Sequence, residues 1–279
     1  MSRISNAKQA EIIQGLYAQF HDPKYLDWDP LSVVREFTSY SNQEYVALIS
    51  ALFAFGGVKQ IIASVRNAVG RLGLTPAGTE VLTLSASELE TRLDGLVHRI
   101  YVGRDLALLT RLYQKSVEVY GSLREHFLIH HDPDAETVEA GLSGLIRDYK
   151  HWATLLGSPG GAHFLHMLNS PQDGSTCKRW LMLLKWYIRE DDGIDLGLWH
   201  GAKGLRPDQL LIPLDTHLFR ISRTLRLTTL KSPNWKCAIQ VTQKLKRLDP
   251  LDPTRFDFSL CRFGMFDRRK LLNRTVTES

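Results

Sequence analysis

Scarce cysteines and the lack of long apolar runs set the first limits on what this chain can be. Its 279 residues contain three scattered cysteines, Cys177, Cys237 and Cys261, and no Cys-x-x-Cys pair. A disulfide framework and a cysteine-built zinc or iron–sulfur site are therefore not expected. Because no run of 18 apolar residues is present, no transmembrane helix is expected either. The N-terminal residues lack the apolar block of a signal peptide, and we expect a reduced, cytoplasmic protein.

Regular alternation of apolar and polar residues is also scarce, which argues against a β-rich fold. Apolar residues instead recur at helical spacing, as at Val58, Ile61, Ile62, Val65 and Val69. Similar stripes cover residues 106–119, 138–152 and 178–188. The expected fold class is therefore all-α.

Three short patterns predict where helices begin. Residues 41–44 and 85–88 each read Ser-x-x-Glu, the capping box of a helix N-terminus. Ser232-Pro233 is typical of a cap followed by proline at the first helical position. The first of these patterns opens residues 45–55, which are apolar almost all round and are expected to form a buried helix that Gly56-Gly57 ends.

Positive charge exceeds negative charge only slightly, with 35 Lys and Arg against 30 Asp and Glu. This balance permits nucleic-acid binding without requiring it. A solvated helix face and a phosphate-binding surface explain the basic residues of the C-terminal third equally well. These residues are Arg220, Arg223, Arg226, Lys231, Lys236, Lys244, Lys246, Arg247, Arg255, Arg262, Arg268, Arg269 and Lys270.

The segment Leu214-Asp215-Thr216-His217-Leu218-Phe219 carries the most specific signal in the chain. Its aspartate stands where a helix is expected to begin. The simplest interpretation of Asp215 is a helix N-cap, because aspartate is among the best acceptors for the free N–H groups of a first turn. His217 is expected to be structural, with hydrogen bonds inside the helix start. A catalytic interpretation of Asp215 requires a second reactive group.

A lysine-bearing turn upstream supplies such a group. Pro171, Asp173 and Gly174 predict a tight turn, after which Ser175 or Thr176 can cap the next helix. Lys178 then lies in the first helical turn, where the helix dipole disfavours its charged form. A neutral amine is the form that a lysine nucleophile needs. The free N–H groups of residues 174–176 and the turn after them can also bind a nucleic-acid phosphate.

The block Ile212–Ile221 resembles the V-D-T-H-hydrophobic-x-R-hydrophobic segment of the helix-hairpin-helix DNA glycosylases. The long gap between Lys178 and this block is similar to that of the archaeal 8-oxoguanine glycosylase branch. The four-cysteine iron–sulfur tail of the endonuclease III branch is absent. The whole chain also resembles an uncharacterised bacterial family that shares the G-S-x-C-K-R and I-P-L-D-T-H blocks.

This resemblance implies two catalytic residues. Asp215 falls on the invariant aspartate of the superfamily, and Lys178 falls on the lysine nucleophile of its bifunctional members. The usual L-P-G-V-G-x-K hairpin is replaced here by residues 170–178, so Lys185, further along the same helix, is the alternative nucleophile. Gly174, Ser175 and Thr176 would contact the DNA phosphates.

The resemblance also implies a pocket for the damaged base. Asp257 and Cys261 lie on a segment similar to the last pocket-lining helix of the archaeal branch, and Asp257 would accept the N7–H hydrogen bond that distinguishes 8-oxoguanine from guanine. A helix N-cap after Pro253 is the structural alternative for Asp257. Phe55 occupies the region where relatives insert a residue into the duplex, and the alternative is a core phenylalanine. Three tryptophans either stack on a base or belong to the core, namely Trp180, Trp186 and Trp199.

The architecture implied is a two-lobed, all-helical glycosylase with a cleft between the lobes. One lobe would comprise residues 43–190, a helical barrel with the hairpin-like lysine turn. The other would combine residues 1–42 with residues 191–279, which carry the catalytic aspartate and the basic C-terminal region.

The implied function is excision of an oxidised purine, with 8-oxoguanine as the expected substrate, followed by AP-lyase cleavage through a lysine Schiff base. Double-stranded DNA with a damaged base is the expected partner, no membrane is involved, and the protein is expected to be a monomer. No metal and no organic cofactor is implied. Two alternatives stay open: a monofunctional glycosylase for another damaged base, in which Asp215 activates water, and a non-catalytic helical protein that binds nucleic acid.

Overall fold

The computed structural model describes residues 5–78, 80–157 and 161–266. The residues described are 62% helix and 2% strand, which confirms the predicted all-α class. The two short strands, β1 (Val97–His98) and β2 (Tyr101–Val102), form an antiparallel hairpin. Within the described segments, every helix is too short or too polar to span a bilayer. Arg268, Arg269 and Lys270 of the basic C-terminal third lie outside the described residues.

The buried apolar side chains form two hydrophobic clusters, which we call the large core and the small core. The large core is built mainly from consecutive helices of the middle of the chain. These helices are α2 (Leu31–Val34), α3 (Tyr40–Leu52), α4 (Val58–Leu72), α5 (Ala86–Leu93), α6 (Gly103–Tyr120), α7 (Leu123–Leu128), α8 (Glu139–Leu155), α9 (Ala162–Met167) and α10 (Lys178–Ile188).

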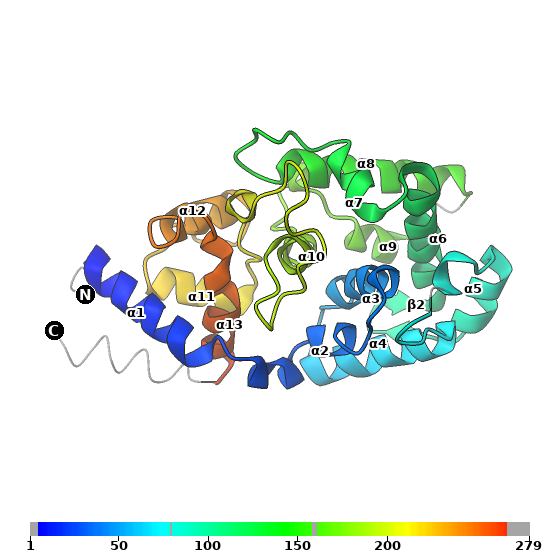
Figure 1. The fold of residues 1–279 in the computed structure, drawn as a ribbon, viewed down its shortest axis with the longest axis horizontal. Coiled ribbons are helices and arrows are strands. Elements are labelled where there is room, and N and C mark those ends of the chain that lie inside the picture. Colours follow the sequence, from blue (N-terminus) through cyan, green and yellow to red (C-terminus); the bar gives the residue numbers. More distant parts are fainter. Residues whose placement is uncertain (1–4, 79, 158–160, 267–279) are drawn as a thin grey trace.

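The small core joins the two ends of the chain. Its apolar residues come from α1 (Asn6–Phe20) and from the C-terminal helices α11 (Thr216–Thr224), α12 (Trp235–Leu245) and α13 (Asp257–Phe266). Helix α13 packs against both α1 and α11. In Figure 1 these helices lie together at one end of the molecule, while α10 is seen end-on near the centre. Helix α10 packs against α3, so it belongs to the large core.

Short 3-10 helices connect several of these elements. They are η1 (Pro23–Trp28), η2 (Glu80–Leu82), η3 (Pro171–Asp173), η4 (Pro207–Gln209) and η5 (Pro253–Phe256).

Of the three predicted helix starts, one is confirmed and two are wrong. Ser85 and Glu88 form the reciprocal capping box of α5. Helix α3 begins earlier than predicted, because Ser39 rather than Ser41 accepts the capping hydrogen bond. Helix α12 begins later, because Asn234 is its N-cap and the Ser232-Pro233 pair precedes the helix. Helix α3 is buried on all sides, as predicted, but it ends at Leu52 rather than at Phe55.

Glu44, predicted to complete a capping box, instead accepts hydrogen bonds inside the large core. Its carboxyl group accepts from Trp199 Nε1 at 2.9 Å and from the hydroxyls of Tyr113 at 3.1 Å and Tyr40 at 3.2 Å. Burial raises the pKa of Glu44 above its usual value. Since a buried polar group is tolerated when it is fully hydrogen-bonded, these three donors explain why Glu44 points inward.

Replacement of Glu44 by alanine is expected to lower the free energy of unfolding by about 3 kcal/mol, because three donors lose a shared acceptor and a cavity opens. Urea unfolding followed by tryptophan fluorescence measures the change. Glu88→Ala, which removes an exposed glutamate from the capping box of α5, is the matched control and should cost about 1 kcal/mol or less. Equal losses in the two variants would contradict the role assigned to Glu44.

Candidate functional site

Lys178 is the first residue of α10, as predicted, but the end of this helix is built differently from the prediction. The N-cap position is held by Cys177, in left-handed conformation with φ of 48°, and it makes no side-chain cap hydrogen bond. The prediction that Ser175 or Thr176 caps α10 is therefore wrong. Ser175 Oγ instead accepts from the backbone N–H of Cys177 at 3.2 Å and so closes the turn before the helix. No side chain therefore acts as the N-cap of α10.

The turn that presents Lys178 is fixed by its own short-range contacts. Ser170 and Asp173 form a reciprocal capping box around η3, and Asp173 also pairs with Lys150 at 3.2 Å. Gly174 follows with φ of 72°, a conformation that glycine adopts without strain. The Pro-Gln-Asp-Gly sequence thus stops η3 and redirects the chain into α10.

Arg179 anchors the start of α10 to three other elements. Its guanidinium donates to the carbonyl of Leu52 at 2.9 Å, at the end of α3, and to the carbonyl of His166 in α9. It also donates to the hydroxyl of Tyr101 in β2. These bonds hold the backbone around Lys178, so Arg179 is a positioning residue that the sequence pattern did not reveal.

Asp215 is the N-cap of α11, as the simplest interpretation of the sequence predicted. Its Oδ1 accepts from the backbone N–H of Leu218 at 2.7 Å. Leu214, just before it, is buried in the small core and fixes the backbone at this point. The carboxylate remains half-buried rather than enclosed. Capping is therefore compatible with a second role for the same side chain.

Lys178 and Asp215 line two adjoining cavities. The larger, of about 560 Å³, also contains the predicted phosphate contacts Ser175 and Thr176, whereas Gly174 is not in its lining. The smaller has a volume of about 170 Å³. Five residues lie in the walls of both cavities, namely Ala54, Gly56, Lys178, Asp215 and His217. The two predicted catalytic residues are thus brought together where the cavities meet.

The smaller cavity contains both predicted base-contacting residues of α13. Asp257 is the first residue of this helix, and its Oδ2 lies 3.4 Å from Lys185 Nζ. Burial raises the pKa of Asp257 to about 6, although the positive charge of Lys185 acts to lower it. Cys261 lies one turn further on, and burial raises the pKa of its thiol to about 12, so the thiol is neutral at physiological pH.

Lys185, the alternative nucleophile, is buried in an ion-pair network. Its Nζ lies 2.9 Å from Asp195 Oδ1, and Asp195 also pairs with Arg189. Although burial disfavours its charge, the carboxylates of Asp195 and Asp257 raise the pKa of Lys185 above its usual value. Because a protonated amine is not a nucleophile, this environment argues for a structural role of Lys185.

Aromatic side chains form part of the smaller cavity wall. Trp186 and Phe258 are buried there, and Trp28, at the end of η1, is 43% exposed. Trp28 was not predicted as a site residue. All three predicted tryptophans are almost fully buried in the large core, where Trp180 and Trp199 donate their indole N–H groups to Met167 and Glu44, and Trp180 also lines the larger cavity. Trp186 is therefore the one of the three predicted tryptophans that lines the smaller cavity.

Phe55 lies at the wall of the larger cavity and not in the core. Its side chain is 36% exposed, so the core alternative is wrong. The Arg99 guanidinium lies 4.8 Å from the ring centroid, and the His166 ring packs edge-on at 5.7 Å. Phe55 and Arg99 together present an aromatic group and a positive charge beside the cavity.

Two other expectations change in the structure. His217, expected to be internal to the helix start, is exposed and lines both cavities. Of the basic C-terminal residues, Arg255 and Arg262 pair with Asp249 and Asp29. These two arginines serve the fold rather than a phosphate-binding surface.

The fold and site define a helical protein in which a lysine at a helix start and an aspartate cap share the junction of two cavities. A family model described as "Protein of unknown function (DUF2400)" matches residues 29–266, and the chain belongs to this family. No curated protein and no solved structure matches the chain. A function therefore has to be argued from the site itself.

Proposed function

We propose that the protein is a DNA glycosylase with AP-lyase activity that excises an oxidised purine, 8-oxoguanine, from double-stranded DNA. The observation that carries this proposal is the placement of Lys178 and Asp215 in the wall shared by the two cavities. The large and small cores would correspond to the two lobes of a glycosylase. Lys178 begins α10, which packs in the large core, and Asp215 caps α11 of the small core, so the pair would span the cleft between the lobes.

Each cavity would bind a different part of the substrate. A helix start without a side-chain cap favours an anion, so the larger cavity beside Ser175 and Thr176 would bind the DNA backbone. Phe55 beside Arg99 would contact the duplex where the target base leaves the stack. The smaller cavity would receive the extruded base, since the predicted base contacts Asp257 and Cys261 lie in its wall. Trp28 and Trp186 supply aromatic surface there.

Lys178 would act as the nucleophile. Its neutral amine attacks C1′, the bond from C1′ to the base breaks, and the base leaves with the electron pair and is protonated. The amine then loses a proton as the sugar ring opens, which gives a protonated Schiff base. Loss of a C2′ proton and departure of the 3′ phosphate cleave the strand by β-elimination. The position of Lys178 in the wall shared by the two cavities, beside Asp215, supports this role.

Asp215 would stabilise the transition state. Breaking the bond to the base develops positive charge on the sugar, and a carboxylate already held in place stabilises that charge without reorganisation. The hydrogen bond from Leu218 fixes the carboxylate at the cavity junction. The N-cap geometry thereby supports the catalytic role rather than competing with it.

Asp257 would recognise the base by accepting the N7–H hydrogen bond of 8-oxoguanine. Because its pKa is raised to about 6, the carboxylate takes up a proton as the pH falls through that value and loses acceptor capacity. We expect excision of 8-oxoguanine by the wild-type protein to fall below about pH 6. At neutral pH, Asp257→Asn should excise 8-oxoguanine about 10- to 100-fold more slowly, which corresponds to a loss of roughly 1–3 kcal/mol of binding to the base. The decrease in rate below about pH 6 should be absent from this variant. Single-turnover excision rates across pH measure both effects.

Cleavage of a duplex with a preformed abasic site is the control for Asp257→Asn, because that substrate has no base to recognise. The variant should keep this activity. Loss of abasic-site cleavage in parallel with excision would show that Asp257 supports the fold instead of the base pocket.

Borohydride reduction in the presence of a duplex with a single 8-oxoguanine tests the proposed function. Borohydride reduces a Schiff base to a stable amine, so the glycosylase–lyase is expected to form a covalent protein–DNA adduct. Base release without an adduct would instead support a monofunctional glycosylase. Binding without base release would support a non-catalytic nucleic-acid-binding protein and would overturn the proposal. A panel of single-lesion duplexes in the same assay determines which oxidised base is preferred.

A further inference from the structure

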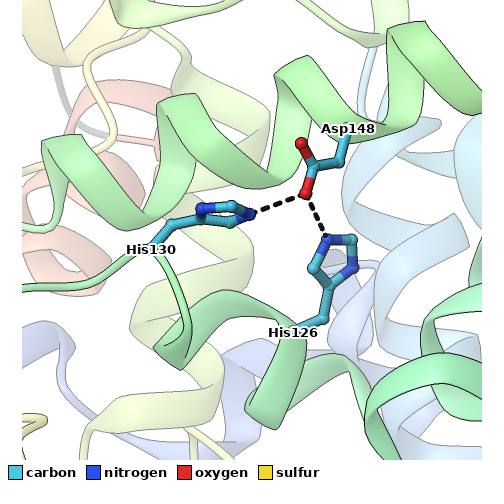
Figure 2. A group of neighbouring side chains, drawn as sticks. All are labelled: His126, His130 and Asp148. Atoms are coloured by element: carbon cyan, nitrogen blue, oxygen red, sulfur yellow. Dashed lines mark hydrogen bonds and ion pairs between the residues drawn. The ribbon is translucent and has the colours of Figure 1, made fainter.

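Two histidines and an aspartate meet at one point between the end of α7 and helix α8 (Figure 2). His126 Nε2 and His130 Nε2 lie 3.2 Å and 2.7 Å from the same carboxylate oxygen, Asp148 Oδ2. The three ligand atoms all lie within 4.8 Å of one another. None of these residues lines the cavities that contain Lys178 and Asp215.

His126 is held in a fixed orientation. It is fully buried, and its ring stacks on Tyr120 with centroids 4.5 Å apart and packs against Trp152 at 4.8 Å. His130 is brought close to α8 by Gly144, where a Cβ atom would stand 2.2 Å from the imidazole. Any larger residue at position 144 would displace His130, so the close approach of the His130 imidazole to Asp148 depends on this glycine.

The hydrogen bonds around His126 favour a lone pair on the nitrogen that faces Asp148. Ser116 Oγ lies 2.9 Å from His126 Nδ1, 3.2 Å from the Leu112 carbonyl and 3.1 Å from the Tyr149 hydroxyl. Because the one hydrogen of this hydroxyl is donated to the Leu112 carbonyl or to the Tyr149 hydroxyl, Ser116 Oγ accepts from His126 Nδ1–H. In the neutral imidazole Nε2 then carries the unshared electron pair and can act as a metal ligand.

Two imidazoles and a carboxylate are a set of ligands that zinc prefers, whereas magnesium and calcium take oxygen ligands. Ligand atoms about 2.1 Å from a tetrahedral zinc are about 3.4 Å apart, so His130 and Asp148 have to separate by less than about 1 Å. Both side chains are about one-fifth exposed and have room to move.

We propose that His126, His130 and Asp148 bind one zinc ion, which links α7 and the residues just after it to helix α8. The bond from His126 Nδ1 to Ser116 would orient the first ligand, because a hydrogen bond to the free ring nitrogen fixes the tautomer and the ring orientation of a metal-bound histidine. His130 also lines a separate cavity of about 690 Å³ between α8 and α12, through which water can reach the ion as the fourth ligand. The site does not depend on the proposed glycosylase activity.

Zinc binding to the EDTA-treated full-length protein tests this proposal. We expect about one zinc per chain by titration and metal analysis, and zinc at about 100 times its Kd should raise the Tm by roughly 5–10 °C. His130→Asn and Asp148→Asn should each lose the bound zinc and the rise in Tm. His151→Asn, an exposed histidine on the same helix, is the matched control and should keep both. Zinc binding that is absent in the wild type or unchanged in the ligand variants would overturn the proposal.

The wild-type protein provides a test that does not depend on folded variants. Cobalt in place of zinc should give the visible absorption of a four-coordinate ion, and zinc should shift the imidazole nitrogen resonances of two histidines. A weak six-coordinate cobalt spectrum with no histidine shift would overturn the site even if both ligand variants failed to fold.

Discussion

Replacement of Lys178 by glutamine is expected to abolish the borohydride-trapped adduct and to slow strand cleavage by at least about 1,000-fold, because glutamine has no nucleophilic amine. The folded state should change little. Lys178 is half-buried at the start of α10, and removal of a cation from a helix start is neutral or slightly stabilising. Trapping and cleavage assays on an 8-oxoguanine duplex, with thermal unfolding of the same samples, measure the two effects separately.

Lys236→Gln is the matched control for charge. Lys236 is an exposed lysine in the first turn of α12, and it lies in the wall of neither cavity. The variant removes the same charge from a similar position and should lower DNA affinity by only the small amount that one phosphate contact contributes. Comparable losses of adduct in Lys178→Gln and Lys236→Gln would mean that general electrostatic attraction, not chemistry, had been removed.

Location of the adduct separates Lys178 from Lys185 without a variant of the buried lysine. Lys185 is ion-paired to Asp195 and Asp257, so its substitution would leave buried carboxylates without a partner and endanger the fold. Proteolysis of the reduced adduct followed by mass spectrometry should place the DNA remnant on Lys178. A remnant on Lys185 would show that the assignment of the nucleophile is wrong although the chemistry is right.

The elements that local sequence determines were predicted well, and those that depend on distant partners were not. The start and end of α10 follow from the Asp173-Gly174 turn and from the apolar stripe, so the predicted range was confirmed. The Ser41 box failed because Trp199 and Tyr113, far away in the chain, draw Glu44 into the core. Contacts between residues so far apart in the chain cannot be predicted from the spacing of residues within one helix.

In the candidate site, too, the residues in local patterns were predicted and those that depend on distant contacts were not. Lys178 and Asp215 could be singled out because each stands at a helix start with a distinctive local pattern. Arg179 and Trp28 could not, because their roles arise from carbonyls and cavity walls on other helices. His126 and His130 stand four residues apart, a spacing that suits a shared ligand, but their partner Asp148 comes from α8 and only the fold brings it to them.

Replacement of Asp215 by asparagine separates the two roles of this residue. Asparagine caps a helix as well as aspartate does, so Asp215→Asn should keep the bond to Leu218 and change the free energy of unfolding by no more than about 0.5 kcal/mol. The negative charge beside the sugar is lost, and base excision should slow by about 100- to 1,000-fold, equivalent to roughly 3–4 kcal/mol of transition-state stabilisation. Single-turnover excision and urea unfolding measure the two quantities on the same protein.

Asp215→Ala and Ser85→Ala complete this comparison. Asp215→Ala removes the cap and should lower the free energy of unfolding by about 1 kcal/mol. Its excision rate should fall by the same factor as that of Asp215→Asn. Ser85→Ala removes the cap of α5, remote from both cavities, and should lose a similar stability with full activity. If Asp215→Asn were fully active and Asp215→Ala lost activity only in proportion to its stability, the aspartate would be a cap alone. A slow but fully stable Asp215→Asn would instead show that its negative charge acts in the reaction.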